Sequence, residues 1–177
     1  MVEPSFGRAT NQPNRLQFLM YCSGRMYRFD SYDGRLNRCL EAAVMLMESF
    51  YGMQRYFDYS IVGHSGDSPF IHSVDFGNLP TNANNRMKVL HKMVARSQYY
   101  QIGDFTLDAM RKSILDINYL SDVDEDSANE NIVISVSDAN LAQYGIRPQE
   151  LGKVMKTDAS SGNITSKSYC IFIAGFG

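Results

Sequence analysis

The sequence predicts an α/β fold of the Rossmann-like, doubly wound type, built on a mostly parallel sheet. Short apolar runs typical of buried strands alternate along the chain with longer amphipathic segments typical of helices. Strands joined by helices form parallel sheets, because each connecting helix packs back on the sheet. At 177 residues, with 44% apolar and 20% charged residues, the chain has the length and composition of one globular domain.

The first half of the sequence supplies two core strands and a helix between them. Residues 16–22 form a short apolar run, which predicts a buried strand. From residue 36 to residue 50 the apolar side chains recur in steps of three and four, which predicts a helix that is buried on most faces. Residues 59–63 predict the second strand, and residues 70–76 a weaker strand at an edge of the sheet.

Residues 84–95 predict a second helix, with Met87, Leu90 and Val94 facing inward. Its outward face carries four basic side chains: Arg86, Lys88, Lys92 and Arg96. A basic helix of this kind occurs in nucleic-acid-binding proteins, but the whole chain has 17 Lys and Arg against 19 Asp and Glu. Because a net charge of -2 leaves no positive excess for a phosphate backbone, we interpret this face as solvent-exposed and exclude nucleic acid as a partner.

The second half continues the alternation of helices and strands. Residues 106–118 predict a third helix, and residues 121–130 an acidic loop. Residues 131–136 and 169–174 are the remaining core strands, with a short helix expected between them at 149–155. Because the sequence stops directly after a strand, where a doubly wound sheet adds a covering helix, we expect a C-terminally truncated form of the fold.

The chain divides into a polar tail, residues 1–14, and a single domain, residues 15–177. The tail has neither the apolar core of a signal peptide nor the arginines of a transit helix, and no apolar run reaches the length of a membrane span. Cys22, Cys39 and Cys170 are widely spaced and odd in number, which predicts small buried thiols in a reducing, intracellular compartment.

The motifs of common enzymes are incomplete or missing. The sequence contains neither a dinucleotide-binding G-x-G-x-x-G nor a P-loop. Residues 63–66 resemble a nucleophile elbow, but Asp67 stands where the motif requires glycine. The histidines lack the spacing of metal ligands and are expected in the core or at the surface: His64, His72 and His91. We therefore expect no catalytic activity.

An acidic stretch resembles the start of a calcium-binding loop. Asp122, Asp124 and Asp126 have the alternating spacing of calcium ligands. Ser127 occupies the position that needs glycine, and Val133 the position of the bidentate carboxylate. We therefore interpret this stretch as a solvated loop.

Three polar loops are expected to meet at the carboxyl ends of the parallel strands, where open α/β sheets bind ligands. These loops are residues 23–26 after the first strand, residues 103–106 before the third helix, and residues 137–140 after the third core strand.

Together these loops resemble those of the von Willebrand factor A domain family. The metal-ion-dependent adhesion site of that family is built from a D-x-S-x-S motif, a threonine and an aspartate. The resemblance runs from about residue 16 to residue 177, and within the family it points to the A domain of a mitochondrial AAA-type ATPase. It implies a mitochondrial location, but no nucleotide hydrolysis, because the ATPase region of that protein has no counterpart in this sequence.

Only part of the adhesion site carries over to this chain. Ser23, Thr106 and Asp138 match the family pattern, whereas Tyr21 stands in place of the first aspartate and Arg25 in place of the second serine. Both replacements make the site less negative, which disfavours a hard divalent cation. We therefore expect no metal or other cofactor. The alternative is an active Mg or Mn site that uses Ser23, Thr106 and Asp138 with water.

Arg25 is the most informative of these replacements. One hypothesis is that Arg25 takes the place of the metal, pairs with Asp138 and hydrogen-bonds Ser23 or Thr106. The other is that Arg25 points to solvent while Asp138 caps a helix that begins at Ala139.

The sequence as a whole predicts a non-catalytic module for protein–protein interactions. We expect it to be an accessory or structural subunit of a larger, mitochondrial assembly whose other protein subunits are its partners. The degenerate adhesion site and the apolar final strand without a covering helix both favour this interpretation. A metal-dependent ligand-binding domain is the alternative function.

Overall fold

The computed structural model describes residues 12–65, 68, 70–99, 105–123, 130–137, 141–156 and 166–172. In these ranges the chain forms one five-stranded sheet, with strand order β3-β2-β1-β4-β5. The strands are β1 (Asn14–Tyr21), β2 (Phe57–His64), β3 (Ile71–Val74), β4 (Asn131–Ser137) and β5 (Lys167–Phe172). The sheet includes Asn14, the last residue of the tail predicted at 1–14.

The sheet is parallel except at one edge. β1 lies at its centre and pairs in parallel with both β2 and β4, and β5 continues the parallel pairing beyond β4. β3 pairs antiparallel with β2 and forms the edge strand that the sequence predicts at residues 70–76. Strand order therefore reverses between β1 and β4, which is where a doubly wound sheet places its ligand site.

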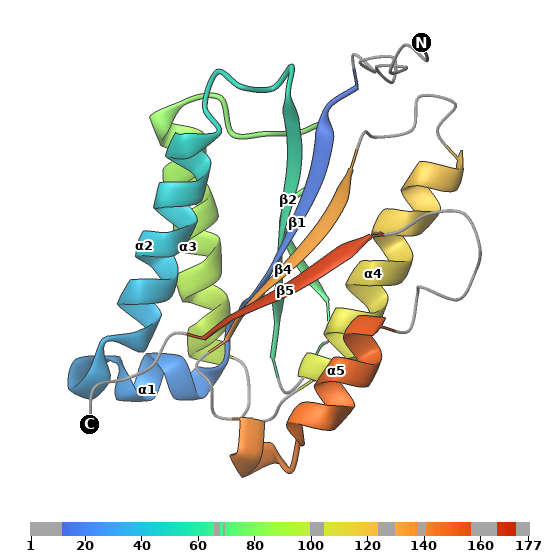
Figure 1. The fold of residues 1–177 in the computed structure, drawn as a ribbon. Helices are drawn as coiled ribbons and strands as arrows, with labels where there is room; N and C mark the ends of the chain where they lie inside the picture. Colours follow the sequence, from blue (N-terminus) through green and yellow to red (C-terminus); the bar gives the residue numbers. More distant parts are fainter. Residues whose placement is uncertain are drawn as a thin grey trace, which may run out of the picture.

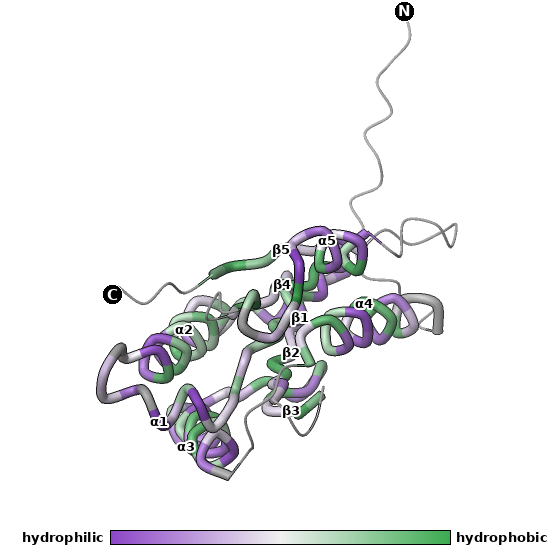
Figure 2. Tube along the Cα trace, turned by 90° about the horizontal axis from the view of Figure 1, so that it is seen from below, coloured by the Kyte–Doolittle hydropathy of each residue, from purple (hydrophilic) through white to green (hydrophobic). Residues whose placement is uncertain are grey.

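Helices cover both faces of the sheet, as the predicted fold requires (Figure 1). The first face carries α1 (Gly24–Asp33), α2 (Arg35–Ser49) and α3 (Ala83–Tyr99). The second carries α4 (Thr106–Val123) and α5 (Pro148–Lys156), and a 3₁₀ turn, η1 (Leu141–Tyr144), precedes α5. Figure 2, an end-on view of the sheet, separates the three layers.

Side chains alternate between the two faces along each strand. On β1, Leu16, Phe18 and Met20 pack into the core cluster that α2 and α3 cover. Leu19 belongs to the second cluster, beneath α4, together with Val62 and Val133 from the neighbouring strands.

The structure corrects the prediction of a loop at residues 23–26. α1 begins at Gly24, shortly after β1, and ends at Asp33; the next residue, Gly34, caps the helix with a left-handed φ of 62°. The segment has no apolar stripe that would mark it as a helix in the sequence. It is held instead by its packing against α3 and by burial of Met26, which is 2% exposed.

The inward face predicted for the helix at 84–95 is also wrong in part. Met87 is 51% exposed, whereas Val89 and Met93 are buried. Arg86, predicted to face outward, is only 14% exposed in its side chain and forms an ion pair of 2.7 Å with Glu48 of α2. Its guanidinium also lies 4.9 Å from the ring centroid of Tyr51, so this cation belongs to the packing between helices.

Two other predicted boundaries move. α3 continues to Tyr99, beyond the predicted end at residue 95. α4 continues to Val123, so the acidic stretch predicted as a loop at 121–130 begins inside a helix.

Candidate functional site

The predicted site lies at the carboxyl edge of the sheet, where β1 ends and α4 begins (Figure 1). Tyr21 is the last residue of β1, Ser23 precedes α1, and Thr106 is the first residue of α4. All three are almost fully buried, with 1%, 0% and 1% exposure, and Arg25 is half-buried. Four of the five predicted positions therefore lie at this edge.

Asp138, the fifth position, lies outside the described residues. Its pairing with Arg25 and its capping of a following helix both stay predictions. Asp67 of the elbow-like motif and Asp124 and Asp126 of the calcium-like loop also lie outside the described residues.

Tyr21, which is predicted to stand in place of the family's first aspartate, packs its ring into the protein. Its hydroxyl lies 3.0 Å from the hydroxyl of Tyr144 in η1, so the phenol joins the end of β1 to the segment after β4. Its ring centroid lies 5.2 Å from that of His64, at the end of the neighbouring strand β2. Tyr21 therefore bridges the two sides of the switch point. The contact with Tyr144, 123 residues away, leaves no local signal in the sequence.

His64 is the most unusual titratable group at this edge. It is fully buried, and burial lowers its pKa from 6.5 to about 3, so the imidazole is neutral at physiological pH. Among the described residues, neither ring nitrogen has a hydrogen-bond partner. The sequence predicts a histidine in the core or at the surface here, and the structure places it in the core, against Tyr21.

The other two histidines are exposed, as that prediction allows. His72 pairs with Asp75 at 2.7 Å, and His91 lies on the outer face of α3. Within the described residues, no three His, Cys, Asp or Glu side chains are grouped as metal ligands would be.

Two thiols lie beneath the site. Cys22 and Cys39 are free and buried, as the sequence predicts, and the Cys39 thiol donates a weak hydrogen bond to the carbonyl of Tyr21 at 3.9 Å. The hydrogen bond with Cys22 and burial raise the pKa of the Cys39 thiol well above its ordinary value. Cys170 on β5 is only half-buried, and burial also raises its pKa. Raised pKa values make the thiols of Cys39 and Cys170 poor nucleophiles.

Among the described site residues there is no carboxylate that could hold a divalent metal. They supply a phenol, two hydroxyls and a guanidinium. A hard cation such as Mg²⁺ needs oxygen ligands with negative charge, and a nearby guanidinium opposes it. The hydroxyl of Ser23 is buried and has no hydrogen-bond partner among the described residues.

Comparison with known proteins identifies relatives of this chain. It is 36% identical over 176 residues to von Willebrand factor A domain-containing protein 8 of Mus musculus; the match covers 99% of this chain and 9% of that protein. The chain thus spans a small part of the length of this relative. No family model matches it.

Among solved structures, the chain is similar to the pilus adhesin SpaC from Lactobacillus rhamnosus GG. Two forms of that adhesin give TM-scores of 0.54 and 0.51 at 18% identity, over 72% of this chain and 15% of the adhesin. At this identity the likeness shows the fold alone. In the described part of the chain, no helix combines the length and the hydropathy needed to cross a membrane.

Proposed function

This chain is a member of the von Willebrand factor A domain family, and on that premise we propose that it is a non-catalytic protein-interaction module without a divalent metal. The family relationship supports a role in protein interactions. One observation carries the proposal: an apolar groove on the face of the sheet where α2 stops short of β5.

The groove lies between α2 and β5 and has a volume of about 220 Å³. Its lining is entirely apolar: Phe18, Ala42, Met45, Leu46, Ile134, Val136 and Ile171. Two of these side chains are largely exposed, Met45 at 63% and Ile171 at 52%, and Tyr169 beside them on β5 is also 52% exposed. Contiguous apolar surface of this kind is typical of binding sites.

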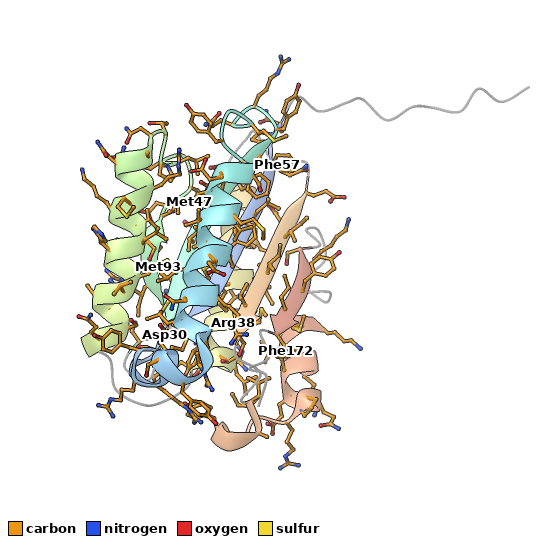
Figure 3. All side chains as sticks on the ribbon, turned by 90° about the vertical axis from the view of Figure 1, so that its left-hand side faces the viewer. Asp30, Arg38, Met47, Phe57, Met93 and Phe172 are labelled. Carbon is orange, nitrogen blue, oxygen red and sulfur yellow. The ribbon has the colours of Figure 1, made fainter. Side chains whose placement is uncertain are left out.

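We infer that the occupant of this groove is an amphipathic helix of a partner protein. α2 and α3 pack over the sheet from β1 to β3, while β4 and β5 extend beyond the edge of α2, toward Phe172 (Figure 3). On the other face, α4 and α5 complete the layer (Figure 2). The uncovered part thus lies beside a helix, in a layer made of helices, so a further helix with an apolar stripe suits it.

A photo-crosslinking residue at position 45 tests this inference. We expect it to capture segments of another protein with apolar residues at helical spacing, and Met45→Glu to lower partner recovery at least tenfold. Met87→Glu is the matched control, because Met87 is also a largely exposed methionine, at 51%, on the neighbouring helix α3. Equal loss in both variants, or crosslinks only to a second copy of this chain, would refute the inference.

The absence of a metal is the second part of the proposal. The Tyr21–Tyr144 contact supports it, because the phenol that replaces the family's carboxylate is already engaged within the protein. The alternative, a metal-dependent ligand-binding domain, is favoured by one observation, the buried and unpartnered hydroxyl of Ser23. In that case Ser23, Thr106 and Asp138 would hold Mg or Mn, and the metal would bind an acidic group of the partner.

We also propose that the chain acts as an accessory subunit of a larger assembly and resides in mitochondria. Both statements rest on the resemblance described above. Fractionation of cells that express the full-length protein tests the location. Recovery outside mitochondria would refute that part and leave the groove unaffected.

A further inference from the structure

A second cavity lies on the opposite face of the sheet, far from the groove between α2 and β5. It has a volume of about 200 Å³ and lies between β1 and β2, the edge strand β3 and the helix α4. Gln17 and Ser60 line it from the sheet, Phe70 and Phe76 from the β3 side, and Tyr119 from α4. Neither the degenerate adhesion site nor the apolar groove shares a residue with it.

The floor of the cavity is polar and unsatisfied. Gln17 and Ser60 are register partners on β1 and β2, and each is only 2% exposed. The amide oxygen of Gln17 and the hydroxyl of Ser60 have no hydrogen-bond partner among the described residues. Buried polar atoms are almost always paired, so two adjacent exceptions that line one cavity indicate that a hydrogen-bonding ligand or water occupies it.

The walls are aromatic and suit a flat cation. Phe70, Phe76 and Tyr119 surround the polar floor. One cation already uses such a ring, because the ammonium of Lys112 lies 4.9 Å from the ring centroid of Phe70. The face of an aromatic ring attracts a cation, and a guanidinium also stacks on it.

Two carboxylates at the cavity supply negative charge. Asp75 already pairs with His72, whose ring nitrogen lies 2.7 Å from one oxygen of the carboxylate. Asp116 on α4 is half-buried, and no ion pair joins it to another described residue. Lys112, the cation near the cavity, lies over the ring of Phe70. The carboxylate of Asp116 is therefore available for a positively charged ligand.

The size of the cavity limits the ligand to a single side chain or a small fragment. A volume of about 200 Å³ is below the roughly 300–1,000 Å³ of pockets that hold drug-sized ligands. A guanidinium has five N–H donors and no acceptor, which matches the unpaired oxygens of Gln17 and Ser60 and the carboxylate of Asp116.

We propose that this cavity binds the guanidinium of an arginine side chain presented by a partner protein. The partner part of this statement rests on the proposed function. Binding of the guanidinium itself does not rest on the proposed function, so we test it with a free amino-acid derivative. A negative result in that test can then be told apart from a negative result for partner binding at the groove between α2 and β5.

The test is an NMR titration of the isotope-labelled chain with N-acetyl-arginine amide. We expect saturable shifts of the Gln17 and Ser60 amide signals. N-acetyl-citrulline amide, which has the same shape without the charge, should bind at least about tenfold more weakly, because hydrogen bonds to charged groups are the stronger ones. N-acetyl-lysine amide should also bind more weakly, because it lacks the planar fork.

Paired variants locate the site. Asp116→Asn should weaken binding of the arginine derivative about tenfold, whereas Asp108→Asn, the same change on an exposed residue of the same helix, should leave it within twofold. Gln17→Leu should abolish binding without lowering the midpoint of unfolding, because leucine has a similar volume and removes a buried amide oxygen that has no partner. Equal binding of arginine and citrulline derivatives, or no saturable shift with any of them, would overturn the proposal, as would equal effects of Asp116→Asn and Asp108→Asn.

Discussion

Acid should destabilise this protein through a single side chain, His64. The residue is fully buried at the end of β2, and burial lowers its pKa from 6.5 to about 3. In the unfolded chain the same imidazole has a pKa of about 6.5, so most molecules carry the proton below that pH. Between pH 6.5 and pH 3 the unfolded state therefore binds more protons than the folded state, so the free energy of unfolding falls as the pH falls.

The size of the effect follows from that difference in pKa. Each pH unit inside the window costs about 1.4 kcal/mol, so acidification from pH 7.5 to pH 5 should remove about 2 kcal/mol. A domain has a free energy of unfolding of roughly 5–15 kcal/mol, so the loss is easy to measure. Asp58 acts in the opposite sense, because burial raises its pKa and its protonation in acid favours the folded state.

Urea denaturation at pH 7.5, 6.0 and 5.0 measures this loss. His64→Phe removes the titrating group and keeps an aromatic ring against Tyr21, so its unfolding free energy should lose about 2 kcal/mol less between pH 7.5 and pH 5 than that of the wild type. The contribution of Asp58 is the same in both proteins and cancels. His91→Gln is the control, since His91 is exposed on α3. An equal pH dependence in the wild type and His64→Phe would refute the reasoning.

Three further predictions concern the junctions and the metal. Gly34→Ala should cost about 1–2 kcal/mol of unfolding free energy, because the left-handed φ of 62° between α1 and α2 strains any side chain; Gly152→Ala, within α5 and with open space around it, should instead stabilise by about 0.5–1 kcal/mol. Tyr21→Phe and Tyr144→Phe should each cost about 1 kcal/mol, and a double-mutant cycle should show that the costs are not additive, since the two hydroxyls share one hydrogen bond. Calorimetric titration with Mg²⁺ or Mn²⁺ should give no saturable heat; saturable binding that Asp138→Ala abolishes would establish the metal-dependent alternative.

Hydrophobic pattern predicts most of the fold correctly. The apolar runs at 16–22, 59–63 and 131–136 are strands of the parallel sheet, and the stripe at 36–50 is α2. The hydrophobic pattern fails to predict a helix that has no apolar stripe. α1 buries Met26 but has no apolar stripe, so its residues predict a loop. On α3 the pattern fails because Arg86 packs inward, where it forms an ion pair with Glu48, while Met87 is exposed.

The sequence by itself determined the fold class of this protein and predicted that its metal site is weakened. The order of strands and helices specifies the α/β sheet, and the replacements at Tyr21 and Arg25 are visible as letters at the positions of a known motif. These features are local, so they can be read from neighbouring residues.

Only the tertiary structure decided the contacts and the burial of the residues discussed above. The hydroxyl of Tyr21 contacts that of Tyr144, 123 residues away. The same fold buries His64, and burial lowers the pKa of its imidazole. Gln17 and Ser60 look like ordinary polar residues until pairing of β1 with β2 places them side by side under a cavity. Burial and pairing depend on residues far apart in the chain, and for that reason they appear only after the chain has folded.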